Sequence, residues 1–438
     1  MVTNIIVPSA DSRRDAGTNT KQEDTSFFDN ALCLHVLSGT IYANHPIVVG
    51  GGLIYPSTDD LFSADTSQDR SDASGVALAR KLNAPRFLKA FGIILLDDLS
   101  EHDAALIGKR ATIIKDFEIG LADPVSTSPM GTPSGDIPWH LETVLRQVRS
   151  PILTGAGVRI GMLDTGIDTS HSEFSGKHIS YMEFDERGFR VSSQPQDFGD
   201  HGTHSAGIAA GSTCGIAPDA DLAIAAVFTK PDRSGNRGTL SQILAGYNWL
   251  VNANHAAPGQ PVSRCSIINS PLGGRGYNDE LYDLIDTCLK SARSLLISAI
   301  GNTGQLGRDN HASPGNYDTV LGVGATDMTE TVAEFSDWGF EPVHSVHKPD
   351  MSAPGVDILS CIPGDQYAKK SGTSMGAALV AGAGALIIQK YPQLAQNPRS
   401  LMIKLLKAVD VSPVNMSENR DREGDSRIGM GRLDLSRI

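Results

Sequence analysis

The chain is poor in cysteine, with 5 in 438 residues. None of the five belongs to a C-x-x-C pair, so a common zinc-binding spacing is missing. An odd number also prevents all of them from pairing within one chain, which argues against a disulfide-stapled scaffold. Because thiols stay reduced in the cytosol, this usage favours a cytoplasmic protein.

Long hydrophobic runs are missing as well. The longest nearly apolar run covers residues 376–388, which is thirteen residues, whereas a membrane helix needs about 20. The N-terminus lacks the basic start and the apolar stretch of a signal peptide. We therefore expect no membrane partner and no conventional secretion. Export by an unconventional route would leave the same pattern.

Positive charge is in deficit, since 37 Lys and Arg stand against 50 Asp and Glu, a net charge of −13. This balance opposes bulk attraction to nucleic acid or anionic lipid, so we expect neither as a partner. Glycine, by contrast, is abundant. Its 45 residues amount to about 10% against a usual ~7%, which predicts many tight turns and close backbone approaches.

Composition divides the chain into four parts. Residues 1–30 are polar and predict a disordered start. Residues 31–121 predict a small α+β module, and residues 122–136, rich in Pro, Ser, Thr and Gly, predict a linker. The strand-like and helix-like runs of the module lie at 32–37, 47–49, 91–96, 99–108 and 111–114. Residues 137–438 form the fourth part.

This last part alternates strand-like and helix-like runs. The strand-like runs lie at 158–163, 222–227, 266–268, 294–299 and 320–324. Helix-like runs include 240–252 and 279–292. Such alternation is typical of an α/β fold with a mostly parallel central sheet and helices on both faces. In that architecture functional side chains gather at the carboxyl ends of the strands.

Three side chains in this part are candidates for chemistry. Asp164 follows a strand-like run, His201 opens a small-residue helix, and Ser374 follows glycine at the start of an apolar helix. Each has an ordinary alternative interpretation. Asp164 is then a turn former and Ser374 a helix N-cap, whereas His201 with His204 would be metal ligands three residues apart. Together, the three supply an orienting carboxylate, a base and a nucleophile.

Four segments carry a family resemblance. Residues 163–168 (LDTGID), 201–204 (HGTH) and 372–375 (GTSM) resemble the three catalytic signatures of the subtilisin-like serine proteases, or subtilases. Residues 300–304 (IGNTG) resemble their oxyanion segment. The resemblance extends from about residue 137 to residue 434, and the four segments occur in family order.

The resemblance implies acyl transfer from a Ser374 acyl-enzyme. His201 would take the proton of Ser374 Oγ and later deliver it to the leaving amine, while Asp164 would hold the imidazole tautomer. The side-chain amide of Asn302 and the Ser374 N–H would hold the developing oxyanion. Peptides or proteins are the implied substrates.

The resemblance also implies where a substrate lies. Residues 235–238, with Gly235 and Gly238, and residues 270–274 would be the two edges between which the substrate adds as a strand. Leu240 and Ile243 would form the S4 pocket, or else a helix packing face. The walls of S1 would come from Leu272, Gly273, Gly274 and Gly301, with Ala312 near its base. These wall segments contain no acidic residue, so we expect an apolar or medium-sized P1 residue rather than a dibasic preference.

The N-terminal module resembles an inhibitor-type prodomain, most clearly over residues 91–119. A prodomain caps the enzyme as a partner within the same chain and leaves its C-terminal tail in the cleft. We therefore expect a zymogen whose linker is cut, so that the mature enzyme begins near Ile137. A separate recruitment domain is the alternative.

Two departures from the family pattern bear on mechanism. Ala378 stands where the family usually has proline, which leaves an N–H in the first turns of the helix and predicts altered partitioning between water and amines. The segment after the histidine helix is too short for the calcium-binding loop of some relatives, although Glu173 occupies a ligand position. We expect no metal site and no required cofactor, with weak calcium binding elsewhere still open. A catalytically impaired peptide-binding or transpeptidating relative and a metal-dependent hydrolase are the competing functions.

Overall fold

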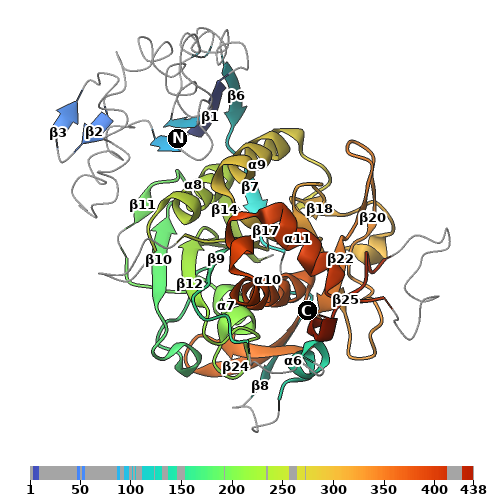
Figure 1. Cartoon of the computed structure of the whole chain (residues 1–438). Helices are drawn as coiled ribbons and strands as arrows, with labels where there is room; N and C mark the ends of the chain where they lie inside the picture. Colours follow the sequence, from blue (N-terminus) through green and yellow to red (C-terminus); the bar gives the residue numbers. More distant parts are fainter. Residues whose placement is uncertain are drawn as a thin grey trace. The chain divides into compact units, whose positions relative to one another are not determined.

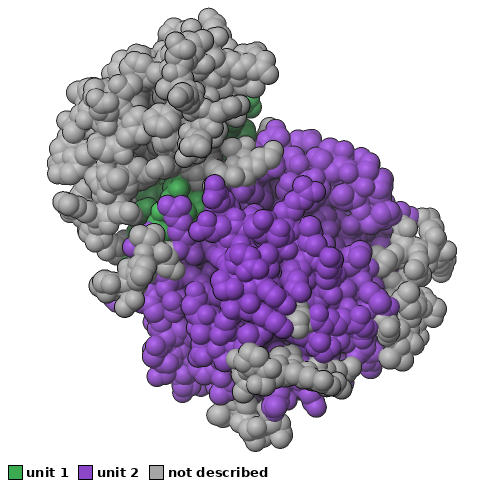
Figure 2. Space-filling model, viewed as in Figure 1, with its two compact units in different colours: residues 1–118, 182–193, 239–253 green, residues 119–181, 194–238, 254–438 purple. Residues whose placement is uncertain are grey.

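The computed structural model describes residues 3–8, 47–49, 52–54, 86–88, 93–97, 101, 104 and 111–437, with gaps at 123, 131–136, 146–152, 192, 233–234, 256–263, 272 and 412–426. The chain divides into two compact units, coloured separately in Figure 2. Unit 1 comprises residues 1–118, 182–193 and 239–253, and unit 2 comprises residues 119–181, 194–238 and 254–438. The unit boundaries therefore differ from the division at residues 121 and 136 that composition predicted.

Unit 2 is built on a mostly parallel sheet, which confirms the expected fold class (Figure 1). The strands of this sheet that lie wholly in unit 2 run in the order β12, β9, β15, β17, β19, β22, β26, β25, and among these neighbouring pairs only the last is antiparallel. Their bounds are Asp221–Ala226, Arg159–Asp164, Ile267–Ser270, Leu295–Ala299, Leu321–Thr326, Met351–Pro354, Arg432–Leu433 and Val409–Asp410. The central strands are wholly buried, as expected when helices cover a parallel sheet.

Three helices of unit 2 pack on this sheet or on one another. They are α7 (His201–Ala210), α10 (Thr373–Lys390) and α11 (Pro398–Lys407). Small residues in α7 and α10 allow the two helices to lie side by side (Figure 1). By length and hydropathy α10 meets the criterion for a membrane span, yet 89% of it is buried inside the protein, as in a core helix.

Smaller elements complete unit 2. The further helices are α6 (Trp139–Val144) and α9 (Asp279–Ala292). The short strands are β8 (Ser126–Met130), β13 (Lys230–Asp232), β14 (Gly235–Thr239), β16 (Gly274–Arg275), β18 (Ala312–Ser313), β20 (Gly339–Glu341), β21 (Val346–Lys348), β23 (Ile358–Ile362) and β24 (Gln366–Ser371). Strand β7 (Glu118–Gly120) lies at the unit boundary and joins β14 in a sheet.

Unit 1 contains a four-stranded sheet in the order β4, β5, β1, β6. The bounds are Arg86–Leu88, Ile93–Asp97, Thr3–Pro8 and Ala111–Lys115. The prediction of a disordered start is wrong for β1, because Ile5 and Ile6 are fully buried and the strand pairs on both sides. The apolar residues of β1 are few, so the composition averaged over residues 1–30 remained polar and did not indicate a strand. The expected strand at 32–37 and helix at 99–108 lie essentially outside the described residues, whereas 47–49 is β2 (Ile47–Val49), paired with β3 (Gly52–Ile54).

Two segments distant in sequence belong to unit 1 as well. Residues 182–193 include the antiparallel pairing of β10 (Ile179–Phe184) with β11 (Arg190–Val191), and helix α8 spans Leu240–Asn252. Asp116, just after β6, accepts a hydrogen bond from the Ser241 N–H at 3.0 Å in the first turn of α8. Within unit 1, the end of the N-terminal module thus meets the start of a helix.

Candidate active site

Asp164 and His201 are brought together by strand β9 and helix α7. Asp164 is the last residue of β9, and His201 is the first of α7. His201 Nδ1 lies 2.8 Å from Asp164 Oδ1, and both side chains are buried. A carboxylate can only accept, so His201 donates through Nδ1, which leaves Nε2 as the basic nitrogen of a neutral ring. His201 Nε2 is buried and has no hydrogen-bond partner among the described residues.

Two glycines permit this approach. Gly166 has φ +121°, in the region that side chains other than glycine rarely adopt. A Cβ on Gly202 would overlap the carbonyl oxygen of Gly166. The start of α7 can therefore lie directly on the turn that follows β9, which fixes His201 beside Asp164.

Ser374 lies at the second position of α10. The N-cap is Gly372, with no side-chain cap, so the interpretation of Ser374 as the N-cap is wrong. Thr373 donates through its N–H and its hydroxyl to Asn302 Oδ1, both at 2.9 Å. Because the amide oxygen of Asn302 is held in this way, its Nδ2 is directed at the position next to Ser374.

That position is occupied by residues of the same chain. Ser374 Oγ donates to the carbonyl oxygen of Ala122 at 2.7 Å, and Asn302 Nδ2 donates to the same oxygen at 3.3 Å. The Ala122 carbonyl oxygen therefore lies against both the candidate nucleophile and the candidate oxyanion donor. Sequence reasoning assigned residue 122 to a linker and missed this contact, which no local pattern signals.

The residues before Ala122 lie between the two expected edges. Leu121 N donates to Asn236 O at 3.3 Å on β14, the strand that contains Gly235 and Gly238. On the other side, Ala122 N donates to Pro271 O at 2.9 Å. Gly273 N also donates to Gly120 O at 3.3 Å. The chain thus forms an added strand between these edges.

The other predicted substrate residues have different surroundings. Gly274 begins β16, which pairs with Ala312 and Ser313 of β18. Leu272 lies outside the described residues. Leu240 and Ile243 lie on α8 in unit 1, and both are fully buried there, as a helix packing face would be.

An unpredicted carboxylate lies against the expected S1 wall. A Cβ on Gly301 would overlap Asp337 Oδ2, and it would lie 3.3 Å from the Ala312 Cβ. Asp337 accepts from the Thr303 N–H at 2.8 Å and hydroxyl at 3.0 Å, next to Asn302. Burial raises the pKa of Asp337 to about 7, against the opposing effect of the Thr303 hydrogen bonds. The sequence-based argument concerned only the residues of the wall segments, and Asp337 lies outside them.

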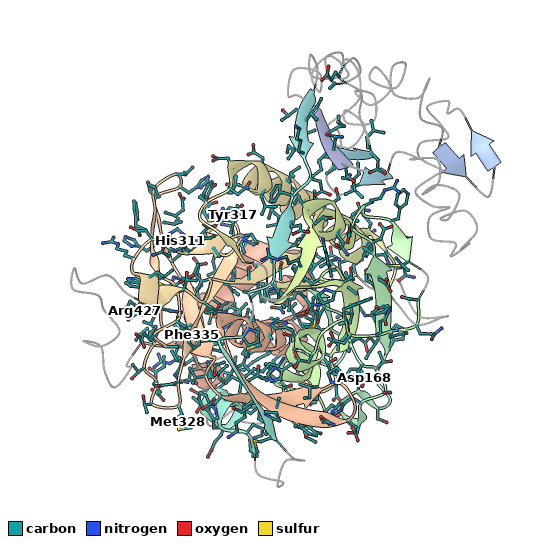
Figure 3. The ribbon with its side chains drawn as sticks, turned by 180° about the vertical axis from the view of Figure 1, so that it is seen from behind. Asp168, His311, Tyr317, Met328, Phe335 and Arg427 are labelled. Atoms are coloured by element: carbon teal, nitrogen blue, oxygen red, sulfur yellow. The ribbon has the colours of Figure 1, made fainter. Side chains whose placement is uncertain are left out.

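Asp337 reaches this place through tertiary contacts. The Gly304 N–H donates to the carbonyl of Phe335 at 2.8 Å, which ties the segment before Asp337 to the turn after Asn302. Phe335 is labelled in Figure 3. The sequence separates the two segments by about thirty residues, and a lone Asp between Ser and Trp carries no motif. Sequence reasoning had no signal for it.

His204 does not face the site. Its Nε2 lies 3.1 Å from both Ile358 O and Ala368 O, and burial lowers its pKa well below the usual value. Within the described part of the chain, no group of three His, Cys, Asp or Glu is placed to hold a metal ion. The interpretation of His201 and His204 as a ligand pair is therefore wrong.

Glu173 is surrounded by donors from the protein. Its carboxylate accepts hydrogen bonds from the Thr213 N–H at 2.7 Å, the Thr213 hydroxyl and the Tyr367 hydroxyl at 2.8 Å. Burial acts to raise the pKa of Glu173, but these hydrogen bonds outweigh it and the pKa is lowered. The short segment after α7 thus satisfies the carboxylate with protein groups.

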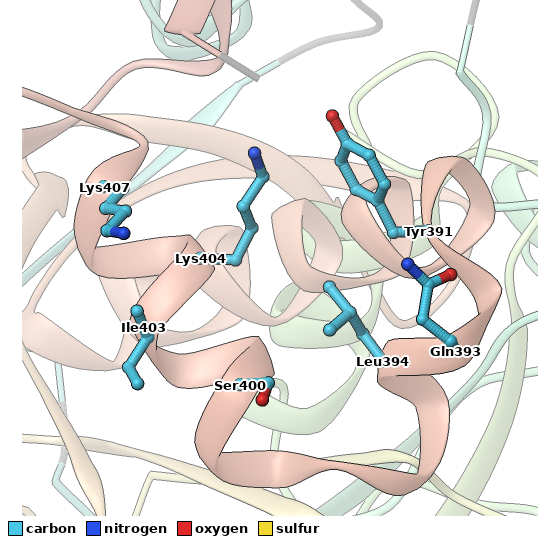
Figure 4. Close-up of a pocket in the computed structure, with 7 residues that line it drawn as sticks. All are labelled: Tyr391, Gln393, Leu394, Ser400, Ile403, Lys404 and Lys407. Carbon is cyan, nitrogen blue, oxygen red and sulfur yellow. The ribbon is translucent and has the colours of Figure 1, made fainter.

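A separate pocket of about 230 Å³ lies at the C-terminal side of α10 and on α11 (Figure 4). Its lining includes Tyr391, Lys404 and Lys407. Lys404 Nζ lies 4.7 Å from the centre of the Tyr391 ring, a cation–π contact. None of the residues of the Asp164–His201–Ser374 group lines this pocket.

Comparisons with known proteins agree with this geometry. Residues 155–431 match the subtilase family model, Peptidase_S8. The chain is 33% identical to subtilisin DY of Bacillus licheniformis over 247 residues, which is 55% of this chain and 80% of that protein. It is 32% identical to the major intracellular serine protease of Bacillus subtilis (strain 168), over 53% of this chain and 69% of that protein.

A solved structure is also similar. The crystal structure of a cold-adapted subtilisin-like serine proteinase matches with a TM-score of 0.53 and 27% identity, covering 68% of this chain and 98% of that one. The family match covers more than half of the chain and includes the strand ends and helix starts described above. The chain therefore belongs to the subtilase family and is a serine endopeptidase.

Proposed function

We propose that this endopeptidase is made as a zymogen that cuts its own chain between Ala122 and Asp123, with Ser374 as the nucleophile. The observation that carries the proposal is the Ala122 carbonyl, which receives hydrogen bonds from Ser374 Oγ at 2.7 Å and Asn302 Nδ2 at 3.3 Å. The bond differs from the sequence-based expectation, which placed the new N-terminus near Ile137. Residues 119–122 then occupy the acyl side as P4 to P1.

Each catalytic group has a defined role in the proposed reaction. For the reaction, the Ser374 hydroxyl turns from the Ala122 carbonyl oxygen to the unpartnered His201 Nε2, which takes its proton as Oγ attacks the carbonyl carbon. Asp164 stabilises the imidazolium that forms. The Asn302 amide stabilises the oxyanion. His201 then protonates the leaving nitrogen of Asp123, and the acyl-enzyme at Ala122 is hydrolysed by water.

The N-terminal module acts as the prodomain in this proposal. Within unit 1, the Leu240 N–H donates to Phe117 O at 2.9 Å, and Asp116 accepts from the Ser241 N–H at 3.0 Å. These contacts anchor the module to the first turn of α8, where unpaired N–H groups favour an acceptor. Residues 119–122, which follow, belong to unit 2 and lie between the two substrate edges of that unit. A role in recruitment alone would not require this anchoring.

The occupied site also bears on substrate choice. Ala122 stands as P1, and its Cβ would lie 3.3 Å from a Cβ added to Gly273. We infer a small or medium apolar P1 residue, as the wall segments suggested. Cys214, Cys265 and Cys361 are free, buried thiols. Together with the intracellular relative, they support a reducing, cytoplasmic setting.

The test is the identity of the cut. Purified wild type should yield a new N-terminus that begins Asp123-Pro124-Val125, and Ser374→Ala should remain full length. Fluorophosphonate should label Ser374 in the wild type and give no labelling in Ser374→Ala. A full-length wild type with an unlabelled Ser374 would contradict the proposal, as would the same cut in Ser374→Ala.

A further inference from the structure

Strand β24 is central in its sheet only because β8 covers it. The order is β23, β24, β8, and both neighbours are antiparallel to β24. The pairing with β8 has a full register of five residues, from Ser126 opposite Ser371 to Met130 opposite Tyr367. Without β8, the main-chain groups on this side of β24 would form an open edge, which binds extended backbone.

Main-chain pairing holds β8 in place. All five of its side chains are exposed, including the 41% exposed Met130. On β24, by contrast, Tyr367, Ala368 and Lys370 are buried. Strand β24 is therefore fixed by its own buried side chains, whereas β8, which pairs with its edge, buries little side-chain surface. Such an edge can accept many sequences, because backbone groups supply the contacts.

The edge leads directly to the catalytic groups. Ser374 lies three residues after the end of β24, and the Val125 N–H donates to Ser371 O at 2.7 Å. Lys370 of β24 forms an ion pair with Asp200, the residue before His201. If the peptide bond between residues 122 and 123 is the one that is cut, residues 126–130 are the fourth to eighth residues on its leaving side.

We propose that the β24 edge is a docking strand for substrates on the leaving side, where it pairs with residues four to eight after the cut bond. The occupant is an extended polypeptide segment with little sequence requirement. In the uncut chain β8 holds this place, and after the cut β8 competes with the substrate for it. The inference rests on the proposed Ser374 chemistry and cut position.

The first experiment varies the leaving side alone. Peptides with one acyl side and leaving sides of three or eight residues are given to the self-cleaved protein. A third peptide has eight leaving residues with two consecutive prolines at positions five and six, which cannot continue a ladder. We expect a KM about tenfold lower for the eight-residue peptide, since several net hydrogen bonds are gained. The proline peptide should resemble the short one.

Equal KM values for all three peptides would overturn the docking strand. A nitroanilide of the acyl side, without leaving-side residues, separates the two proposals. If it is hydrolysed while leaving-side length has no effect, the docking strand fails and the catalytic proposal stands. If neither nitroanilide nor peptides are hydrolysed, the proposed function has failed.

The second experiment weakens the competitor. In a strand, the N–H groups of neighbouring residues point to opposite sides, so one of residues 127 and 128 directs its N–H at β24. The double variant Thr127→Pro with Ser128→Pro therefore removes one hydrogen-bond donor from the β8–β24 pairing, whichever residue it is. Thr127→Ala with Ser128→Ala keeps both amides and is the matched control. The proline pair should lower the KM of the eight-residue peptide and leave the nitroanilide kinetics unchanged. The same KM in both pairs, with equal melting temperatures, would show that β8 is no competitor.

Discussion

His201 Nδ1 donates to Asp164 Oδ1 across 2.8 Å, at a place where both side chains are buried. The carboxylate thereby selects the tautomer that leaves Nε2 as the base. In Asp164→Asn, the His201 ring would face a side-chain amide, which can donate as well as accept a hydrogen bond. The tautomer with its proton on Nε2 then becomes possible, and this tautomer cannot act as the base. We expect kcat to fall by about 10⁴-fold with little loss of stability.

The measurement is kcat with a peptide nitroanilide, together with the melting temperature. Asp168→Asn is the control, because Asp168 holds the nearby turn through Ser170 and Gly364 but does not contact His201. A similar loss of kcat in both variants would mean that the effect is structural.

Gly273 lies close to Ala122, the proposed P1 residue. A Cβ there would lie 3.3 Å from the Ala122 Cβ, and Gly273 is not at positive φ, so Gly273→Ala should fold normally. Crowding of P1 should raise KM roughly tenfold and slow self-cleavage, as expected for an overpacked contact. For the rate of self-cleavage, Gly120→Ala is the control, since no atom lies within 4 Å of the added methyl group. Unchanged kinetics in Gly273→Ala would place P1 elsewhere.

Asp337 predicts a pH dependence of stability. Burial raises its pKa in the folded chain to about 7, above its usual value of about 4. The folded state therefore binds this proton more tightly, and the contribution to stability present below pH 4 is lost as the pH rises through 7. Asp337→Asn has no such proton.

Denaturant unfolding of the two proteins in a Ser374→Ala background, which prevents self-digestion, measures this difference. Between pH 4 and 7 the free energy of unfolding of the protein with Asp337 intact should decline relative to that of the Asp337→Asn variant. Parallel curves over this range would contradict the prediction.

The fold was largely predictable wherever the sequence of a single helix or strand shows its own hydrophobic periodicity. The limits of α8 and α9 agree with the sequence-based ranges, and the main strands agree to within about two residues. The close approach of Asp164 and His201 was expected from the resemblance of residues 163–168 and 201–204 to the subtilase signatures, and the two side chains lie 2.8 Å apart.

Elements defined by distant partners were missed. Strand β1 pairs with residues about ninety positions later, and β8 pairs with β24 more than two hundred positions away. Their sequences are short or polar, so local propensity is weak and tertiary pairing decides the structure. Asp337 and Ala122 were missed for the same reason.

Glu173 bears on metal dependence. Thr213, Tyr367 and the Cys214 N–H satisfy its carboxylate, so EDTA should leave the melting temperature unchanged. Glu173→Gln should lower the free energy of unfolding at pH 7 by about 1–3 kcal/mol. Because the folded pKa is lowered, this contribution is present above the unfolded pKa and is lost as the pH falls. Glu142→Gln, at an exposed position, is the control. A large decrease with EDTA would contradict the prediction.

Ala378 tests the partition between water and amines. In a regular helix its N–H pairs with the Ser374 carbonyl, and proline would remove that bond at a cost of up to about 3 kcal/mol. Ala378→Pro should relax the first turns of α10 and shift acyl transfer toward water. Product ratios with an added amine nucleophile measure this shift. Ala378→Ser keeps the N–H, and the same ratio in all three proteins would rule out the effect.

The hydrogen bond from Ser374 to Ala122 has a kinetic consequence, because both residues belong to one compact unit of one chain. Cleavage of the peptide bond after Ala122 by Ser374 of the same chain would be unimolecular. Its half-time would therefore not change on dilution. Every molecule would consume one bond of its own before it meets any other polypeptide, and a culture or cell with few copies would activate them as fast as one with many.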